Sequence, residues 1–150
     1  MFPKVHLIAG FIFSIIVFLF FPQISWIGFI LIFLSSFLVD IDHYLFYFWL
    51  KKDYSLKNAF KWFVEKTKQA FSLPKNQRKK LGEVPCIFHG LETTLVLIFL
   101  SFISKIFLYI LIGALFHYLL DFLYLVQNGF SLRGHLGSQI FNIVKYNSSD

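Results

Sequence analysis

Residues 113–124 read GALFHYLLDFLY, an apolar stretch that contains one histidine and one aspartate four residues apart. Residues four apart lie on the same face of an α-helix, so His117 and Asp121 share a stripe with Gly113. The surrounding run, 106–126, has the length of about 20 residues that a helix needs to cross a bilayer. The stretch therefore predicts a membrane-spanning helix with two ionisable side chains, which are costly in lipid unless they are compensated.

The composition of the whole chain agrees with a membrane protein. Of its 150 residues, 57% are hydrophobic, 22 are Phe and only 15% are charged. A soluble domain of this size leaves too much surface in water to hide so many apolar side chains. Three further apolar runs approach or exceed the length of a span. We therefore predict an all-α membrane bundle of four transmembrane helices, at about 5–21, 24–50, 84–103 and 106–126.

Positive charge is concentrated between the second and third runs. Ten of the 14 Lys and Arg lie in the loop 51–83, which has only three acidic residues. The positive-inside rule then places this loop and both termini in the cytoplasm. Apolar residues recur in the loop at helical spacing among lysines, which predicts a basic amphipathic helix on the inner membrane surface, in contact with anionic lipid headgroups. This distribution argues against nucleic acid as the partner.

The domain organisation follows from the same pattern. Residues 1–127 are predicted to form the membrane-embedded domain, and 128–150 a polar cytoplasmic tail that includes His135. The sequence leaves the oligomeric state open. Cys86 is the only cysteine, which excludes a disulfide within the chain, and we interpret it as a small apolar packing residue.

Ionisable residues recur at the predicted cytoplasmic ends of the spans. They are His6, Asp40, Asp42, His43, His89, Glu92, His117 and Asp121. Because the spans alternate in direction, all eight fall in the cytoplasmic half of the membrane, whereas the outer halves are almost purely apolar. Gly10 and Gly113 lie on the stripes of His6 and His117 and permit close helix approach. We therefore expect side chains from four spans to meet in one cluster.

Imidazole and carboxylate together are the ligand set that suits zinc, iron or manganese. We predict one or two divalent ions, with zinc favoured, bound by His6, Asp40, His43, His89, Glu92, His117 and Asp121. A metal would lower the pKa of a bound water to about 7. Asp42 and Glu92 are the candidate catalytic groups, as a general base or as a support for a ligand imidazole. The alternative is a polar network between helices without a metal.

The order of these pieces resembles the YdjM-type family of predicted membrane-bound metal-dependent hydrolases, which is distantly similar to zinc-dependent phospholipase C. The matching pieces, within residues 4–125, are His6 with Gly10, 38–43 (LVDIDH), 89–93 (HGLET), and His117 with Asp121. The chain departs from the family pattern at Val39, where proline is usual, and at Gly90, where arginine is usual. The second histidine of the third element is replaced by Glu92.

We therefore predict a membrane-bound hydrolase in which a metal-activated water attacks a phosphoester. A lipid or lipid-linked substrate is expected, because the cluster lies level with the inner-leaflet headgroups. Two other functions remain open: a metal carrier or channel, and a non-catalytic scaffold with a basic lipid-binding loop. A carrier needs a polar route across the whole membrane, and the apolar outer halves of the spans do not provide one.

Overall fold

The computed structural model describes residues 3–80, 86–132 and 137–139. In these ranges every regular element is helical, which confirms the all-α prediction for this part of the chain. The elements are α1 (Pro3–Phe20), α2 (Trp26–Leu38), α3 (Ile41–Lys51), α4 (Leu56–Ser72), the 3-10 turn η1 (Arg78–Lys80), α5 (Leu91–Ser101) and α6 (Lys105–Asn128).

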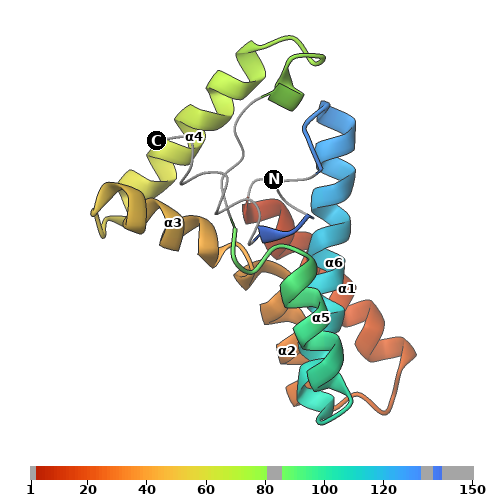
Figure 1. Ribbon diagram of the computed structural model, residues 1–150. Coiled ribbons are helices and arrows are strands. Elements are labelled where there is room, and N and C mark those ends of the chain that lie inside the picture. The colour runs from red at the N-terminus through yellow and green to blue at the C-terminus, as the bar shows by residue number, and fades with distance from the viewer. Residues whose placement is uncertain (1–2, 81–85, 133–136, 140–150) are drawn as a thin grey trace.

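Helices α1, α2, α5 and α6 form a bundle (Figure 1). α6 contacts the other three, and α1 also packs on α2. The α1–α2 and α5–α6 connections lie at the same end of the bundle (Figure 1). A serine begins each returning helix there: the Ser25 side chain accepts a hydrogen bond from Gly28 N, and the Ser104 side chain accepts one from Ile106 N. These caps satisfy backbone N–H groups that a helix start leaves without partners.

Three helical segments are long and apolar enough to cross a membrane, namely Pro3–Phe20, Trp26–Lys51 and Lys105–Asn128. Large apolar side chains at their ends are exposed, such as Phe20 at 77% and Trp26 at 69%. Apolar surface of this extent is typical of contact with lipid rather than water. The structure is therefore consistent with an integral membrane protein.

The third predicted span, 84–103, is represented by a shorter helix. α5 has 11 residues and covers about 16 Å, against about 30 Å for the hydrocarbon core of a bilayer. It begins at Leu91 because Gly90 has φ 138°, a backbone conformation that a helix cannot continue and that favours glycine. The count of four full spans therefore stays a prediction.

The second predicted span, 24–50, is interrupted. α2 ends at Leu38 and α3 begins at Ile41, and α3 turns away from the bundle (Figure 1). Around the break the backbone bonds join residues three apart: Asp40 N to Phe37 O, Asp42 N to Val39 O, and His43 N to Asp40 O. This tighter winding replaces the α-helical ladder, and it places Asp40 at a corner of the chain.

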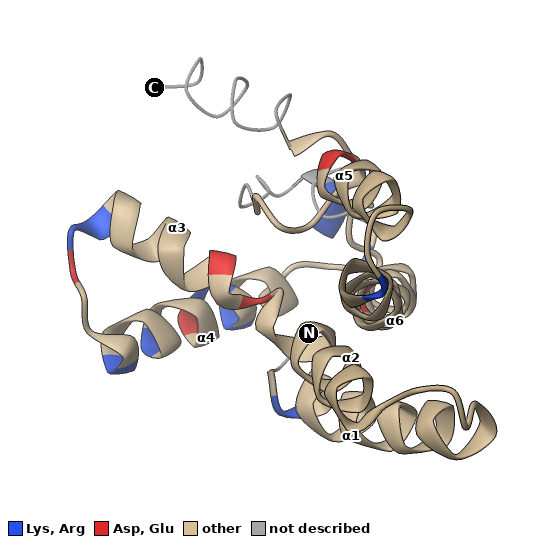
Figure 2. Cartoon of the chain, turned by 90° about the horizontal axis from the view of Figure 1, so that it is seen from below, with Lys and Arg blue, Asp and Glu red and all other residues tan. Residues whose placement is uncertain are grey.

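Helix α4 packs against α3 and carries Lys57, Lys61, Lys66 and Lys68. Figure 2 shows Lys and Arg along α4 and the adjoining turns, whereas α2 and α5 are almost free of them. Asp53 fixes the connection to α3, because it accepts hydrogen bonds from the Tyr47 hydroxyl at 2.7 Å, Asn58 Nδ2 at 2.9 Å and Ser55 N at 2.9 Å. These bonds hold the pKa of the Asp53 carboxyl below its ordinary value, and the bond from Tyr47 has the largest effect.

Candidate metal centre

Five ionisable side chains from four parts of the chain meet where α3 leaves the bundle. His6 comes from α1, Asp40 from the corner before α3, and His89 from the loop before α5; His117 and Asp121 come from α6. The three imidazoles are 0% exposed and Asp121 is 1% exposed. The structure thus brings together five of the seven residues that the sequence predicts as metal ligands, and a sixth, His43, borders them with Nδ1 3.5 Å from Asp40 Oδ1.

Two glycines allow the helices to approach closely enough for this. A side chain carbon added at Gly113 of α6 would overlap Ser35 Oγ and the Ile32 carbonyl oxygen of α2. One added at Gly10 of α1 would overlap Ser36 Oγ of α2. Small residues permit this kind of close contact between membrane helices, and here they lie one turn from His6 and His117.

Four ligand atoms form the centre of the cluster. The Nε2 atoms of His89 and His117 lie 2.9 Å apart. Asp40 Oδ1 lies 3.5 and 3.6 Å from these two nitrogens, and Asp121 Oδ2 lies 3.4 and 3.2 Å from them. In a tetrahedral zinc site with bonds of about 2.0–2.1 Å, neighbouring ligand atoms are about 3.3 Å apart. These four atoms, which we call the ligand quartet, therefore have the spacing of a tetrahedral metal site.

The hydrogen bonds of Nδ1 in His89 and His117 show which ring nitrogen of each histidine carries the proton. His117 Nδ1 lies 2.9 Å from the Ser36 carbonyl oxygen, which can only accept a hydrogen bond, so Nδ1 carries the proton. His89 Nδ1 lies 2.9 Å from Asp42 Oδ2 and donates to it in the same way. In the neutral rings, both Nε2 atoms then present lone pairs to each other at 2.9 Å. Such an arrangement repels unless a proton or a metal cation lies between them.

His6 extends the cluster beside the quartet. Its ring stacks on that of His117, with centroids 4.0 Å apart. His6 Nε2 lies 3.1 Å from Asp121 Oδ1 and 3.9 Å from Asp40 Oδ2. Each aspartate therefore presents one oxygen to the quartet and its other oxygen to His6. Among the described residues, Asp40 Oδ2 and His6 Nδ1 are buried without a hydrogen-bond partner, and a carboxylate oxygen in this condition fits a place that a cation fills.

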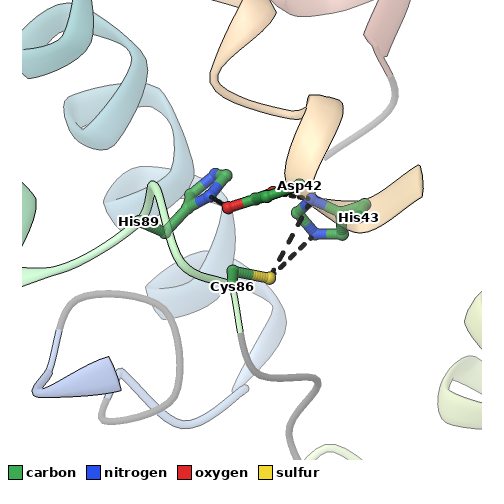
Figure 3. A group of neighbouring side chains, drawn as sticks. All are labelled: Asp42, His43, Cys86 and His89. Atoms are coloured by element: carbon green, nitrogen blue, oxygen red, sulfur yellow. Dashed lines mark hydrogen bonds and ion pairs between the residues drawn. The ribbon is translucent and has the colours of Figure 1, made fainter. Parts of the chain in front are cut away.

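A second group of potential ligand atoms adjoins the first (Figure 3). It consists of Asp42, His43, Cys86 and His89, whose ligand atoms all lie within 4.8 Å of one another. Asp42 Oδ1 lies 3.0 Å from His43 Nδ1, and Cys86 Sγ lies 3.6 Å from His43 Nε2. Asp42 Oδ2 accepts a hydrogen bond from Phe88 N at 2.9 Å in addition to that from His89. Asp42 thus bonds the His43 ring, the His89 ring and the backbone N–H of Phe88, which precedes His89.

Glu92 belongs to neither group of potential metal ligands among the described residues. It lies in the first turn of α5, where Oε2 accepts a hydrogen bond from Gln139 N at 3.0 Å and Oε1 accepts one from Ser138 Oγ. Its predicted role as a ligand or general base stays a prediction. His135, which the sequence assigns to the tail, lies outside the described residues.

Sequence reasoning did not place Cys86 in the cluster. A single cysteine outside any periodic pattern carries no signal for this position, and Cys86 comes from a non-helical loop rather than from a helix face. The thiol is 0% exposed. The contribution of residues 137–139, through Gln139 and Ser138, was equally absent from the sequence argument, which treated 128–150 only as a polar tail.

No protein-family profile, curated protein or solved structure matches this chain. The resemblance to the YdjM-type family therefore remains a prediction from the motifs. The chemical case for the site depends on its donor set: buried imidazole nitrogens and carboxylate oxygens at the mutual distances given above.

Proposed function

We propose that this protein is a membrane-embedded, metal-dependent hydrolase, as the resemblance to the YdjM-type family implies. One observation supports it above all: the Nε2 atoms of His89 and His117 face each other at 2.9 Å, with an oxygen of Asp40 and one of Asp121 beside them. Nitrogen and oxygen donors at this spacing suit zinc, with manganese or iron as alternatives.

The cluster offers two places for a divalent ion. The ligand quartet surrounds the first. His6 Nε2, Asp40 Oδ2 and Asp121 Oδ1 border the second, which has three protein atoms and so keeps a position for water, as catalytic zinc sites do. Asp40, Asp42 and Asp121 bring three negative charges when ionised. One divalent ion leaves a single negative charge and two leave a single positive charge, so either number makes burial of the carboxylates less costly.

A bound metal ion would lower the pKa of its water to about 7. The side chains of the chain itself would orient and neutralise the site. Asp42 holds the His89 ring through Nδ1, the usual way in which a carboxylate fixes a ligand imidazole. Of the three aspartates, Asp40 has the most accessible side chain, at 16% against 1% for Asp42 and 2% for Asp121. Asp40 is therefore the carboxylate of the three that lies nearest to solvent.

The substrate that we propose is a phosphoester of a lipid or a lipid-linked molecule. Asp40 of the site lies at the corner where α3 leaves the apolar bundle, and the lysine-bearing α4 packs against α3. In the four-crossing topology proposed from the sequence, the positive-inside rule puts this corner at the inner leaflet. Lysines of α4 would then attract anionic headgroups to the membrane surface beside the site.

Metal analysis and lipid hydrolysis test the proposal together. The full chain, purified in detergent and reconstituted in vesicles, is assayed for metal content and for release of phosphate-containing headgroups. Wild type should contain one or two ions per chain and hydrolyse the lipid, His117→Ala should lose both properties, and His135→Ala should retain both. A metal-free wild type with the same turnover as His117→Ala contradicts the proposal.

The same preparation separates the competing functions. Metal uptake into vesicles without hydrolysis would favour a carrier. Bound metal without hydrolysis or uptake would favour a binding protein. Lipid recruitment that survives His117→Ala but not charge reversal of the α4 lysines would favour a scaffold.

A further inference from the structure

The loop that carries His89 has no regular structure of its own. Residues 86–90 lie between the undescribed residues before them and the start of α5, and only His89 N to Cys86 O, at 3.1 Å, joins two backbone groups within the loop. A metal ligand must be held within about 0.5 Å of its place to bind well. The position of His89 therefore depends on what other parts of the chain hold this loop.

Within the described part of the chain, the loop is held by α5, where Thr93 Oγ1 donates to the Ile87 carbonyl oxygen at 2.9 Å, and by three other parts. From α3, Asp42 bonds His89 Nδ1 and Phe88 N. From α6, the Tyr118 hydroxyl donates to the Phe88 carbonyl oxygen at 2.6 Å. The third contact comes from residues 137–139, which follow α6 in sequence and belong to none of the helices of the bundle.

The contacts of residues 137–139 lie on both sides of His89. Before it, Gln139 Oε1 accepts a hydrogen bond from Cys86 N at 3.0 Å. After it, Leu91 N lies 3.4 Å from the Gly137 carbonyl oxygen, and Glu92 accepts hydrogen bonds from Ser138 and Gln139. Gln139 is 3% exposed. A buried amide that bonds a backbone N–H holds that backbone in place, since breaking the bond leaves a buried donor without a partner.

Gly90 shows how close this packing is. A side chain carbon at Gly90 would lie 2.7 Å from Gln139 Cγ and 2.7 Å from the Gly137 carbonyl oxygen. The arginine that is usual at this position in the family that the chain resembles would therefore meet both steric overlap and an unfavourable φ of 138°. The close packing of residues 137–139 on the loop therefore requires a glycine at position 90.

We propose that residues 137–139 clamp the loop 86–92 and thereby position His89 for metal binding. Glu92 is then a docking point for the clamp, and Gln139 is a positioning residue, separated from the metal by the loop. The effect on metal affinity rests on the proposed metal-dependent function, whereas the clamp itself does not.

Labelling of the single cysteine, in protein that a chelator keeps free of metal, tests the clamp separately from metal binding. Cys86 is the only thiol of the chain and is fully buried, and its backbone N–H is the group that Gln139 holds. In the full chain in detergent, Gln139→Ala and Glu92→Ala should each raise the rate of Cys86 modification by a maleimide about tenfold, because Gln139→Ala removes the buried bond to Cys86 N and Glu92→Ala removes the bonds that hold residues 138 and 139. Gln127→Ala, the same change at an exposed position of α6, should leave the rate unchanged.

Zinc affinity, measured by competition with a chromogenic chelator, tests the consequence. Gln139→Ala and Glu92→Ala should each bind zinc about tenfold more weakly, at the lower end of the range for groups that support metal ligands. Gln139→Met keeps the length of the side chain and replaces the alanine variant if that fails to fold.

The outcomes test two claims separately: that residues 137–139 clamp the loop, and that the clamp positions His89 for metal binding. Unchanged labelling in both variants overturns the clamp. Faster labelling with unchanged zinc affinity overturns the positioning of His89. Loss of zinc in Glu92→Ala without faster labelling also overturns it, since Glu92 would then be a ligand. A wild type that binds no zinc contradicts the proposed function, while the labelling rates still decide the clamp.

Discussion

Asp42 and His89 are 47 positions apart in the sequence, yet Asp42 Oδ2 lies 2.9 Å from His89 Nδ1. This contact joins the first turn of α3 to the loop before α5. It fixes the ring so that Nε2 points at His117, and it leaves Asp42 outside the quartet. Carboxylates in this position raise the basicity of the imidazole and hold its orientation.

Replacement of Asp42 should therefore weaken metal binding without abolishing it. We expect Asp42→Asn to lower zinc affinity by about 10- to 100-fold with an unchanged number of ions per chain. Competition with a chromogenic chelator gives the affinity, and elemental analysis gives the number of ions. Asp53→Asn makes the same chemical change outside the site and should keep the zinc affinity of wild type at neutral pH. Complete loss of an ion in Asp42→Asn would instead make Asp42 a ligand.

Metal removal should destabilise the fold, because the buried carboxylates lose their counter-charge. At a free zinc concentration of about 100 times Kd, binding adds about 2.7 kcal/mol of stability. A chelator should therefore lower the unfolding temperature of wild type in detergent. His117→Ala should unfold at the same temperature with and without zinc. If a chelator leaves the unfolding temperature of wild type unchanged, the result favours a polar network between helices without a metal.

Close packing of α6 on α2 should make Gly113 intolerant of even one methyl group. Gly113→Ala introduces a carbon that overlaps the Ile32 carbonyl oxygen, which is backbone and cannot rotate away. Overpacking of this kind costs about 1–3 kcal/mol. Unfolding in a mixed detergent series measures the loss. Val126→Ile adds one methyl group to an exposed position of the same helix and should be close to neutral.

The joint between α3 and α4 should open in acid. The pKa of Asp53 lies below its ordinary value in the folded chain, so its ionised form stabilises the joint above the unfolded pKa of about 3.9. That stabilisation is lost as the pH falls through the lower, folded pKa. We expect the fluorescence of Trp62, which lies against Tyr47 with ring centroids 5.8 Å apart, to change below about pH 4 in a chain with Trp26→Phe and Trp49→Phe. Asp53→Asn in that background should lack the transition.

The helical class and the meeting of distant side chains could be predicted from the sequence because both depend on periodicity. His117 and Asp121 lie four apart in an apolar run, and α6 follows that run closely, from Lys105 to Asn128. His6 with Gly10 on α1 obeys the same rule. Spacing along one helix fixes a face, and the small residues on these faces indicate where helices meet.

Breaks in helices could not be predicted in this way. The run 24–50 is apolar through Val39. Hydropathy does not show that the backbone hydrogen bonds near Asp40 join residues three apart instead of four apart, as in an α-helix. The start of α5 depends on the φ of Gly90, which in turn depends on packing against residues 137–139. Contacts made by a tail without periodic pattern cannot be recognised from composition. The position of Cys86 and the hydrogen-bond partners of Glu92 could therefore not be predicted from the sequence.

The short length of α5 has a consequence for the surrounding lipid. A helix of 11 residues cannot match the hydrocarbon thickness, and a bilayer accommodates such mismatch by local thinning. Headgroups beside α5 would then sink toward the level of His89, while lipid around α6 keeps its full depth. Under the proposed function, bilayer thickness would then set how far a phosphate must travel to reach the site, and acyl chains of increasing length should draw the headgroups away from it.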